Sequence, residues 1–542
     1  MKPRGAAVAA VASLLLAAPT GALAAEPPPG AVKSDNLEYV RWVPDTRQVV
    51  EGKFDEVRGR ELLILTGRFG FKTLDVSDPT NPQPLDSFIP ADLAEDGYWQ
   101  NEDMEIDTRR KLIIGALDPR HTDNPLADCP PGGSTSNVAC KSGFYVISYR
   151  DPANLRQVGD FVELPSGHTS TCIQGCRYIW TGGPARRSDQ DWLGTIINPA
   201  PGDITLNNRL IGNGRPIWVT DLSDPANPQI SAEPVDLWRN DQYTDYSHDV
   251  DEDERGIAWV AGRGGIRGYA TSGLHRDPFQ NRWRRATPFD PILVAGGGLQ
   301  WDDPTVEGDD GVAQATMFMH NSGRPTDRSV GAAGVERGNV LIGTEEDFTT
   351  PCGNSGRIVA SDLTDSWGGE PAQRSTRTNP YRMKTLDSFH PFIDTPETAN
   401  PSLGCSAHYF EIDGPLLGAA WYGQGLRLVA IHDARNMRQV GYYRVTNPNP
   451  SEPPPATDPS SNSWDVEFKS DRNKGDLIYL FDMSRGVEVL RLKKGVAAAS
   501  SMRSVTAPSV RRDPSAAKPV GALAQASRPG GSVTYVCPLF AG

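Results

Sequence analysis

Short apolar runs recur along the chain between Asn36 and Leu492. Seven of them are rich in Leu, Ile, Val, Trp and Tyr: LLILTG from Leu62, KLIIGA from Lys111, RYIWTGG from Arg177, IAWVAG from Ile257, NVLIGT from Asn339, LLGAAWYG from Leu416 and LIYLFD from Leu477. Each is followed by a second run, usually opened by glycine, that begins at Gly70, Gly143, Arg215, Gly265, Gly356, Gly425 or Gly486. Runs of this length and composition are typical of β-strands, so the pattern predicts seven strand pairs.

A polar phrase follows several of these second runs. Its four clearest copies are TLDVSDPTNPQPLDSF from Thr73, VISYRDPANLRQVGDF from Val146, WVTDLSDPANPQISAEPV from Trp218 and LVAIHDARNMRQVGYYRV from Leu428. Asp accepts a backbone hydrogen bond and Pro fixes φ, so each copy predicts a β-hairpin, although the fourth has Ala in place of Pro. The repetition predicts an all-β fold, a seven-bladed β-propeller with four-stranded blades. Six blades are the alternative, because the fourth and fifth units have long outer parts.

The last unit has no clear outer strand, whereas an extra strand, LEYVRWVP from Leu37, precedes the first unit. We expect this N-terminal strand to complete the seventh blade and close the ring, which removes exposed sheet edges. Over its four hairpins the chain resembles the LVIVD repeat family, named for an apolar strand ending in Asp. The resemblance implies a β-propeller and says little about activity.

The two ends of the chain differ from the repeats in composition. Residues 1–24 are predicted to be a secretory signal peptide, with Lys2 and Arg4, an apolar stretch and a small-residue cleavage site at Ala22-Leu23-Ala24. We expect a short linker over 25–36, the propeller over 37–495, and a disordered Ala/Ser/Arg/Pro-rich tail over 496–542. No other run is long and apolar enough to cross a bilayer. The protein is therefore expected to be secreted, extracellular or in the cell envelope, without a membrane span.

Seven cysteines suit an oxidising compartment. The expected disulfides are Cys129–Cys140 and Cys172–Cys176, with two of Cys352, Cys405 and Cys537 left to form a third. Zinc is the alternative for the CIQGC pair, but the sequence has no second pair with matching spacing.

The formal charge of −14 argues against nucleic acid and anionic membrane surfaces as partners. The sequence also has no serine-hydrolase elbow, zinc-protease helix, P-loop or dinucleotide glycine fingerprint in a fitting context. These classes of function are therefore not supported.

Four of the eight histidines occupy corresponding places in their units. His168, His248, His320 and His408 each stand at the start of the strand that precedes the apolar run, and Glu102 occupies that place in the second unit. The first strand of a propeller blade lines the central channel, so we expect these side chains to form one layer around the axis. The other histidines have no repeated context.

Neutral imidazoles beside a carboxylate suit Fe, Cu or Zn. The seventh unit places Trp464 at the layer position, which we expect to lie opposite the ligands and to leave an open coordination position. The alternative is structural: each histidine would hydrogen-bond the backbone of the neighbouring blade and join the blades together. Both interpretations remain open at this point.

Three acidic residues, Glu345, Glu346 and Asp347, directly follow an apolar run. They are candidates for an outer shell of hydrogen-bond partners around the histidines.

Other acidic residues are assigned to no site. Glu105, Asp251 and Glu411 lie three residues after layer positions, so strand alternation predicts that they face away from the layer side chains. Asp249, Asp251 and Asp253 in DVDEDERG do not fit a calcium-loop pattern and predict a polar hairpin turn.

Two functions are compatible with these features. The first is an extracellular binding module, in which the loops 118–141, 184–215 and 275–310 contact a protein, a glycan or a small molecule. The second is a metal-dependent oxidoreductase or hydrolase that uses the four histidines and Glu102. The sequence favours the first, because the repeat carries no recurrent nucleophile or cofactor motif.

Overall fold

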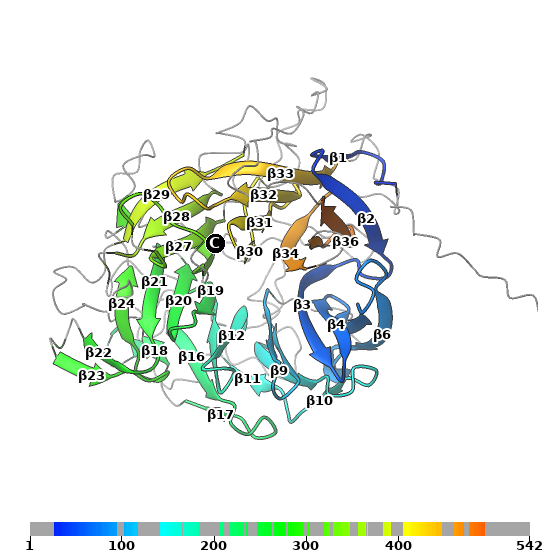
Figure 1. The fold of residues 1–542 in the computed structure, drawn as a ribbon. Helices are drawn as coiled ribbons and strands as arrows, with labels where there is room; N and C mark the ends of the chain where they lie inside the picture. The colour runs from blue at the N-terminus through cyan, green and yellow to red at the C-terminus, as the bar shows by residue number, and fades with distance from the viewer. Residues whose placement is uncertain are drawn as a thin grey trace, which may run out of the picture.

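The fold is taken from a computed structural model of the chain. It describes residues 26–94, 102–117, 141–164, 166–183, 205–206, 209–210, 216–231, 234–236, 247–262, 265–277, 280, 282–296, 301–302, 319–325, 329–335, 337–346, 356–364, 366, 383–391, 405–446, 460–470 and 476–493. In this part of the chain seven sheets of four or five strands stand around a central channel (Figure 1). The prediction of a seven-bladed β-propeller is confirmed, and the count of six is excluded.

The first three blades follow one another from residue 49. Blade 1 contains β3 (Val49–Val57), β4 (Arg60–Gly67), β5 (Gly70–Asp75) and β6 (Gln83–Phe88), and the short helix α1 (Ala91–Ala94) follows it. Blade 2 contains β7 (Met104–Asp107), β8 (Leu112–Leu117), β9 (Gly143–Ser148), β10 (Arg156–Gln157) and β11 (Val162–Glu163). Blade 3 contains β12 (Thr169–Ile173), β13 (Tyr178–Gly182), β16 (Pro216–Asp221), β17 (Gln229–Ile230) and β18 (Val235–Asp236).

The remaining blades complete the circle. Blade 4 contains β19 (Asp249–Glu252), β20 (Ile257–Gly262), β21 (Gly265–Ala270) and β24 (Ile292–Gly296). Blade 5 contains β25 (Trp301–Asp302), β26 (Met319–Gly323), β27 (Val340–Glu345), β28 (Ile358–Asp362) and β29 (Met383–Phe389). Blade 6 contains β30 (Phe410–Asp413), β31 (Leu416–Ala420), β32 (Leu426–Ala430) and β33 (Arg438–Val445), and blade 7 contains β34 (Ser463–Lys469), β35 (Leu477–Asp482) and β36 (Gly486–Leu492). Two separate hairpins join β14 (Thr205–Leu206) to β15 (Arg209–Leu210) and β22 (Leu274–Asp277) to β23 (Arg282–Arg285).

The N-terminal segment closes the ring. Strand β2 (Leu37–Val43) pairs antiparallel with β36, from Leu37 opposite Leu492 to Val43 opposite Val487, as the sequence predicts. Strand β1 (Ala31–Lys33) lies within the segment expected to be a linker, and it pairs with β33 at the outer edge of blade 6. The first strands of the chain therefore fasten two neighbouring blades rather than one.

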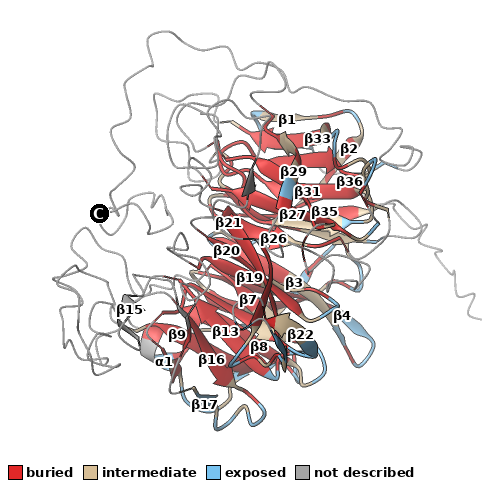
Figure 2. Cartoon of the chain, turned by 90° about the vertical axis from the view of Figure 1, so that its left-hand side faces the viewer, coloured by how far each residue is buried: buried red, intermediate tan, exposed pale blue. Residues whose placement is uncertain are grey.

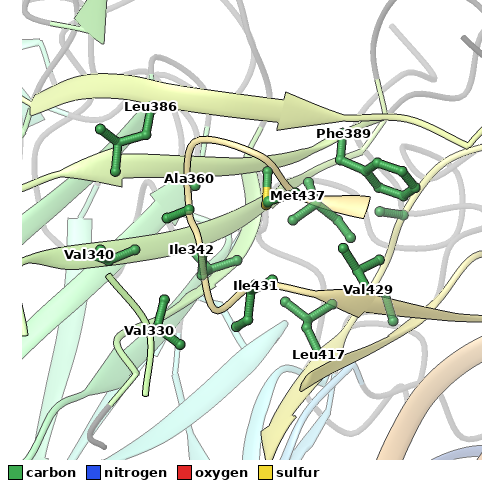
Figure 3. Close-up of a cluster of buried hydrophobic side chains, with 14 of the residues drawn as sticks. Val330, Val340, Ile342, Ala360, Leu386, Phe389, Leu417, Val429, Ile431 and Met437 are labelled. Atoms are coloured by element: carbon green, nitrogen blue, oxygen red, sulfur yellow. The ribbon is translucent and has the colours of Figure 1, made fainter. Parts of the chain in front are cut away.

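The hydrophobic core is divided among the contacts between blades, with one buried cluster at each of the seven contacts. Adjacent residues of the second strand serve opposite contacts: Ile64 packs toward blade 2, and Leu63 and Leu65 pack toward blade 7. This strand must be apolar on both faces, which explains the continuous apolar runs in the sequence. Figure 3 shows the cluster between blades 5 and 6, and the blade strands are buried through most of their length in Figure 2.

The cysteines agree in part with the predicted pairs. Cys172 and Cys176 form a disulfide across the turn between β12 and β13, as predicted, and Cys405 is disulfide-bonded too. Cys129 and Cys140 lie outside the described residues, as do the predicted signal peptide and tail. Within the described part of the chain, no helix has the length and apolar character needed to cross a membrane.

Candidate metal centre in the central channel

The five residues predicted to form a layer come together in the channel. His168 and His248 directly precede the innermost strands β12 and β19, and His320 lies on β26. His408 and Glu102 lie two residues before the first residues of β30 and β7. Figure 1 labels β12, β19 and β30 near the axis of the ring. All five side chains are completely buried.

A repeated β-bulge sets the direction of these side chains. The amide of His168 donates to the carbonyl of Gly182, and the next residue, Thr169, is also paired with Gly182. The inner strands of blades 4 and 6 begin in the same way, and the register of β26 shifts at His320. Two residues therefore face one partner, which is the definition of a bulge. A bulge turns the layer residue toward the channel without interrupting the strand that follows.

The ligand-type atoms of the layer lie within contact distance of one another. The Nε2 atoms of His168 and His248 are 2.8 Å apart, and the Nε2 of His408 lies 2.9 Å from Oε1 of Glu102. The Nε2 of His320 is 3.5 Å from the same carboxylate oxygen. Successive imidazole rings from His168 to His408 have centroids 4.4, 4.3 and 3.9 Å apart. The four rings thus form a continuous arc closed by Glu102.

Backbone carbonyls of the next blade fix two of the tautomers. Nδ1 of His248 donates to the carbonyl of His320 at 2.8 Å, and Nδ1 of His408 donates to the carbonyl of Trp464 at 2.6 Å. A carbonyl oxygen only accepts, so both imidazoles carry a proton on Nδ1, and the Nε2 atom of each faces the cluster. Metal-ligating histidines are usually oriented by such a second hydrogen bond. The structural interpretation is therefore correct for Nδ1 of His248 and of His408, while their Nε2 atoms remain directed at the layer.

Burial favours the neutral form of these imidazoles. It lowers the pKa of His248 well below its usual range, and the neighbouring His168 and His408 lower this pKa further. The pKa of His320 is lowered for the same reasons, first by burial and then by His408 and His248. Neutral imidazole is the form that binds metals.

The arrangement can hold a metal ion. Three groups bring their ligand atoms within 4.8 Å of one another: Glu102 with His168 and His248, Glu102 with His320 and His408, and Glu346 with His248 and His320. The second oxygen of Glu102, Oε2, is buried and has no hydrogen-bond partner. A buried carboxylate oxygen without a partner is costly, and a cation bound among these ligands would satisfy it.

Glu346 lies closer to the layer than an outer-shell position implies. Its Oε1 is 3.9 Å from Nε2 of His408 and accepts a hydrogen bond from the hydroxyl of Tyr422. Tyr422 has a positive φ of 25°, which is rare for a bulky residue and is found mostly where function requires it. Glu345 is directed elsewhere, because it forms an ion pair with Arg357 at 2.6 Å. Asp347 lies outside the described residues.

Trp464 lies beside the ligands instead of opposite them, since the ring centroids of Trp464 and His408 are 4.8 Å apart. Trp464 forms a small buried apolar cluster with Val50, Tyr422 and Met483. This cluster occupies the part of the ring next to blades 7 and 1, which contribute no ligand to the layer. The predicted open side of the layer is therefore closed by apolar side chains.

The prediction that Glu105, Asp251 and Glu411 face away from the channel is wrong. All three line a cavity in the channel, together with residues that directly follow the layer. Strand alternation was counted from the layer residue, but the bulge at that residue shifts the alternation by one. The side chains one and three positions after the bulge therefore face the channel as well.

The acidic DVDEDERG segment is a hairpin turn only at its end. Asp253 accepts hydrogen bonds from the amides of Arg255 and Ile257 at 2.9 and 3.1 Å, as a turn residue does. Asp249 and Asp251 lie on β19 and line the channel cavity. The turn prediction is wrong for these two residues, because their acidic side chains belong to a strand that faces a polar cavity.

No protein-family model matches the chain, and no curated protein sequence matches it. Similar solved structures include the β-propeller domain of Cps50 (Swd1) from Myceliophteria thermophila (TM-score 0.41, 9% identity, 84% of this chain and 99% of that one). Another is the periplasmic gluconolactonase PpgL of Pseudomonas aeruginosa (TM-score 0.39, 10% identity, 72% of this chain and 84% of that one). A third is the extracellular domain of a putative one-component system, BT4673, of B. thetaiotaomicron (TM-score 0.41, 11% identity, 84% of this chain and 39% of that one). These likenesses concern the fold alone.

Proposed function

We propose that the protein is a secreted, metal-dependent β-propeller of the LVIVD repeat type. Its centre binds one transition-metal ion, Fe, Cu or Zn, through His168, His248, His320, His408 and Glu102. The observation that carries the proposal is the convergence of these buried ligand atoms from five consecutive blades. Oxidoreductase and hydrolase are the reaction classes that such an ion supports.

The donor set favours a transition metal over calcium or magnesium. Imidazole nitrogen is a ligand for Fe, Cu and Zn, whereas calcium and magnesium prefer oxygen. The imidazole of His248, whose neutral form burial favours and whose Nδ1 hydrogen bond fixes its orientation, is ready to bind without losing a proton. Glu346, held by Tyr422, is placed to accept a hydrogen bond from a group bound at the centre or to act as a further ligand.

Secretion and membership of the LVIVD family rest on the sequence. The signal-like start at residues 1–24 and the Asp-Pro hairpins support them. The disulfide between Cys172 and Cys176 is consistent with an oxidising compartment.

Metal content of the purified chain tests the proposal. We expect about one equivalent of Fe, Cu or Zn by mass spectrometry, and its loss in a His248→Ala, His408→Ala double variant. Because buried histidines can be needed for folding, Glu102→Gln is the conservative second variant, expected to weaken metal binding roughly 10- to 100-fold. The matched control is His275→Ala, His432→Ala, which removes two histidines outside the channel that retain some exposure.

Absence of metal from the folded protein would contradict the proposal. If the folded wild type holds no metal, even after reconstitution with Fe, Cu and Zn, the metal-dependent function is wrong. The second candidate, an extracellular binding module, would then take its place. The hairpin β22–β23 and the loop after it favour that candidate, since Leu274, Trp283 and Phe289 are 60%, 51% and 44% exposed there.

A further inference from the structure

A cavity of about 370 Å³ occupies the channel next to the histidine layer. The innermost strands of six blades contribute to it: β3, β7, β19, β26, β30 and β34. Tyr409 connects the two regions, because it lines the cavity while its ring lies 4.5 Å from that of His320 and 4.9 Å from that of His408. The cavity has a size typical of small-molecule sites.

The cavity wall carries a large excess of carboxylates. Its acidic residues are Glu51, Asp103, Glu105, Asp249, Asp251, Glu411 and Asp465. Two cationic side chains also line it, and both already have acidic partners. Lys53 lies 2.9 Å from Glu51 and 3.1 Å from Glu467, and Arg324 lies 3.1 Å from Asp253, which is not in the wall.

Two buried polar groups in the wall lack hydrogen-bond partners. Asp465 is 4% exposed, and its Oδ2 has no partner. The hydroxyl of Tyr409, a residue 9% exposed, has none either. Since a buried polar atom without a partner costs free energy, both atoms indicate that something polar belongs in this space.

The spread of the carboxylates fits an extended cation better than a single metal ion. A bound ion needs its ligand atoms around one point, yet the groups of ligand atoms within 4.8 Å found in the described residues all contain histidines of the layer. The carboxylates instead form two levels, one and three residues after the layer. Two residues of strand separate these levels by about 6.6 Å. This separation is comparable to the distance between the amino groups of a short aliphatic diamine.

We propose that the acidic channel cavity binds a small organic cation with two or more protonated amino groups, of the aliphatic diamine or polyamine class. One amino group would lie among Asp103, Asp249 and Asp465, and another between Asp251 and Glu411. The aliphatic linker would lie along Tyr409. The proposal depends on the carboxylates and remains valid whether or not the layer holds a metal.

Calorimetric titration of the full chain with putrescine and spermidine tests it. We expect saturable binding of both amines and none of butane-1,4-diol, the uncharged analogue of putrescine. Asp465→Asn and Glu411→Gln are each expected to weaken binding at least tenfold. Glu56→Gln is the matched control, because it makes the same change of carboxyl to amide at an exposed position outside the cavity. Circular dichroism verifies that each variant is folded.

Three results would overturn the proposal: absence of amine binding to the folded wild type, equal binding by the cavity variants and the control, or saturable binding of Ca²⁺ in place of the amines. The titration is repeated after treatment with a chelator. Amine binding that persists without metal would support the cavity independently of the metal centre. A protein that holds metal but binds no amine would refute amine binding in the cavity and leave the proposed metal centre intact.

Discussion

The carboxylates of the channel cavity are close enough to alter one another's protonation. Burial and the neighbouring Glu467 and Asp465 together raise the pKa of Glu411 to about 8, against the opposing effect of Lys53. Burial also raises the pKa of Glu105 and of Asp251 to about 7. In the folded protein these groups hold protons at a pH where carboxylates of an unfolded chain are ionised.

This difference predicts that stability falls as the pH rises. The carboxyl of Glu411 has a higher pKa in the folded state than its ordinary 4.5, so the folded state binds more protons between the two values. Its stabilising contribution is complete below about pH 4.5 and is lost as the pH approaches 8. Glu411→Gln keeps the size of the side chain and cannot ionise. We expect it to stabilise the protein at pH 8 by up to about 4 kcal/mol relative to wild type, measured by urea unfolding.

At pH 5 the same variant should be close to wild type in stability. Glu56→Gln, which changes an exposed carboxylate, should show no such pH-dependent gain. A Glu411→Gln variant that is no more stable than wild type at pH 8 would mean that Glu411 is ionised in the folded state.

The histidines of the candidate site could be predicted from the sequence, whereas the carboxylates of the neighbouring cavity could not. His168, His248, His320 and His408 could be identified because each stands at the start of the strand before an apolar run, at a similar spacing in three units and before an insertion in the unit of His320. The carboxylates after them were missed, because a bulge leaves no mark in the alternation of apolar and polar residues. A bulge at each layer position is visible only in the pairing of β12, β19, β26 and β30 with their neighbours.

At the scale of the element, the glycine that opens the third strand of a blade has a steric role. Gly70 has φ +83°, and a Cβ at this position would lie 2.4 Å from the carbonyl oxygen of Phe88 on β6. The missing side chain allows the outer strand to approach the turn between β4 and β5. Gly425 occupies the same place in blade 6, where a Cβ would lie 2.1 Å from the carbonyl oxygen of Tyr443.

Blade 1 offers a matched pair of glycines that separates crowding from backbone strain. Gly59, in the turn between β3 and β4, has φ +79° and no atom within 4 Å of its missing Cβ. Gly59→Ala should cost about 1 kcal/mol for the positive φ alone. Gly70→Ala adds the clash with Phe88 and should cost about 3 kcal/mol. Chemical denaturation compares the two variants, and equal losses would contradict a steric role for Gly70.

The elements were predictable to different degrees. The apolar second strands were found because both of their faces are buried, so that five or six consecutive residues are apolar. Strand β1 was missed, since Ala31–Lys33 is only three residues long, is half-buried and carries no alternating pattern. Its position is fixed by pairing with β33, which is more than 400 residues away in the chain.

At the scale of the whole molecule, a ring of seven blades is stable only if its two ends are joined. Each blade packs against two neighbours, and the cluster between blades 6 and 7 includes Leu37 and Tyr39 from β2. The indole of Trp42 adds a hydrogen bond to the carbonyl of Arg485 at 2.6 Å. Strand β2 therefore both covers the edge of β36 and contributes to the core.

Shortening the N-terminus should consequently weaken the ring in two unequal steps. A chain that begins at Asn36 loses β1, whose residues are half-buried, and should unfold only slightly more easily than a chain that begins at residue 25. A chain that begins at Pro44 also loses the buried side chains of Leu37, Tyr39 and Val43, which costs on the order of 5 kcal/mol. It also exposes the edge of β36, so that aggregation is expected. Thermal unfolding and size-exclusion chromatography of the three chains measure both effects. Equal melting temperatures for the chains beginning at 25 and 44 would show that β2 does not hold the ring together.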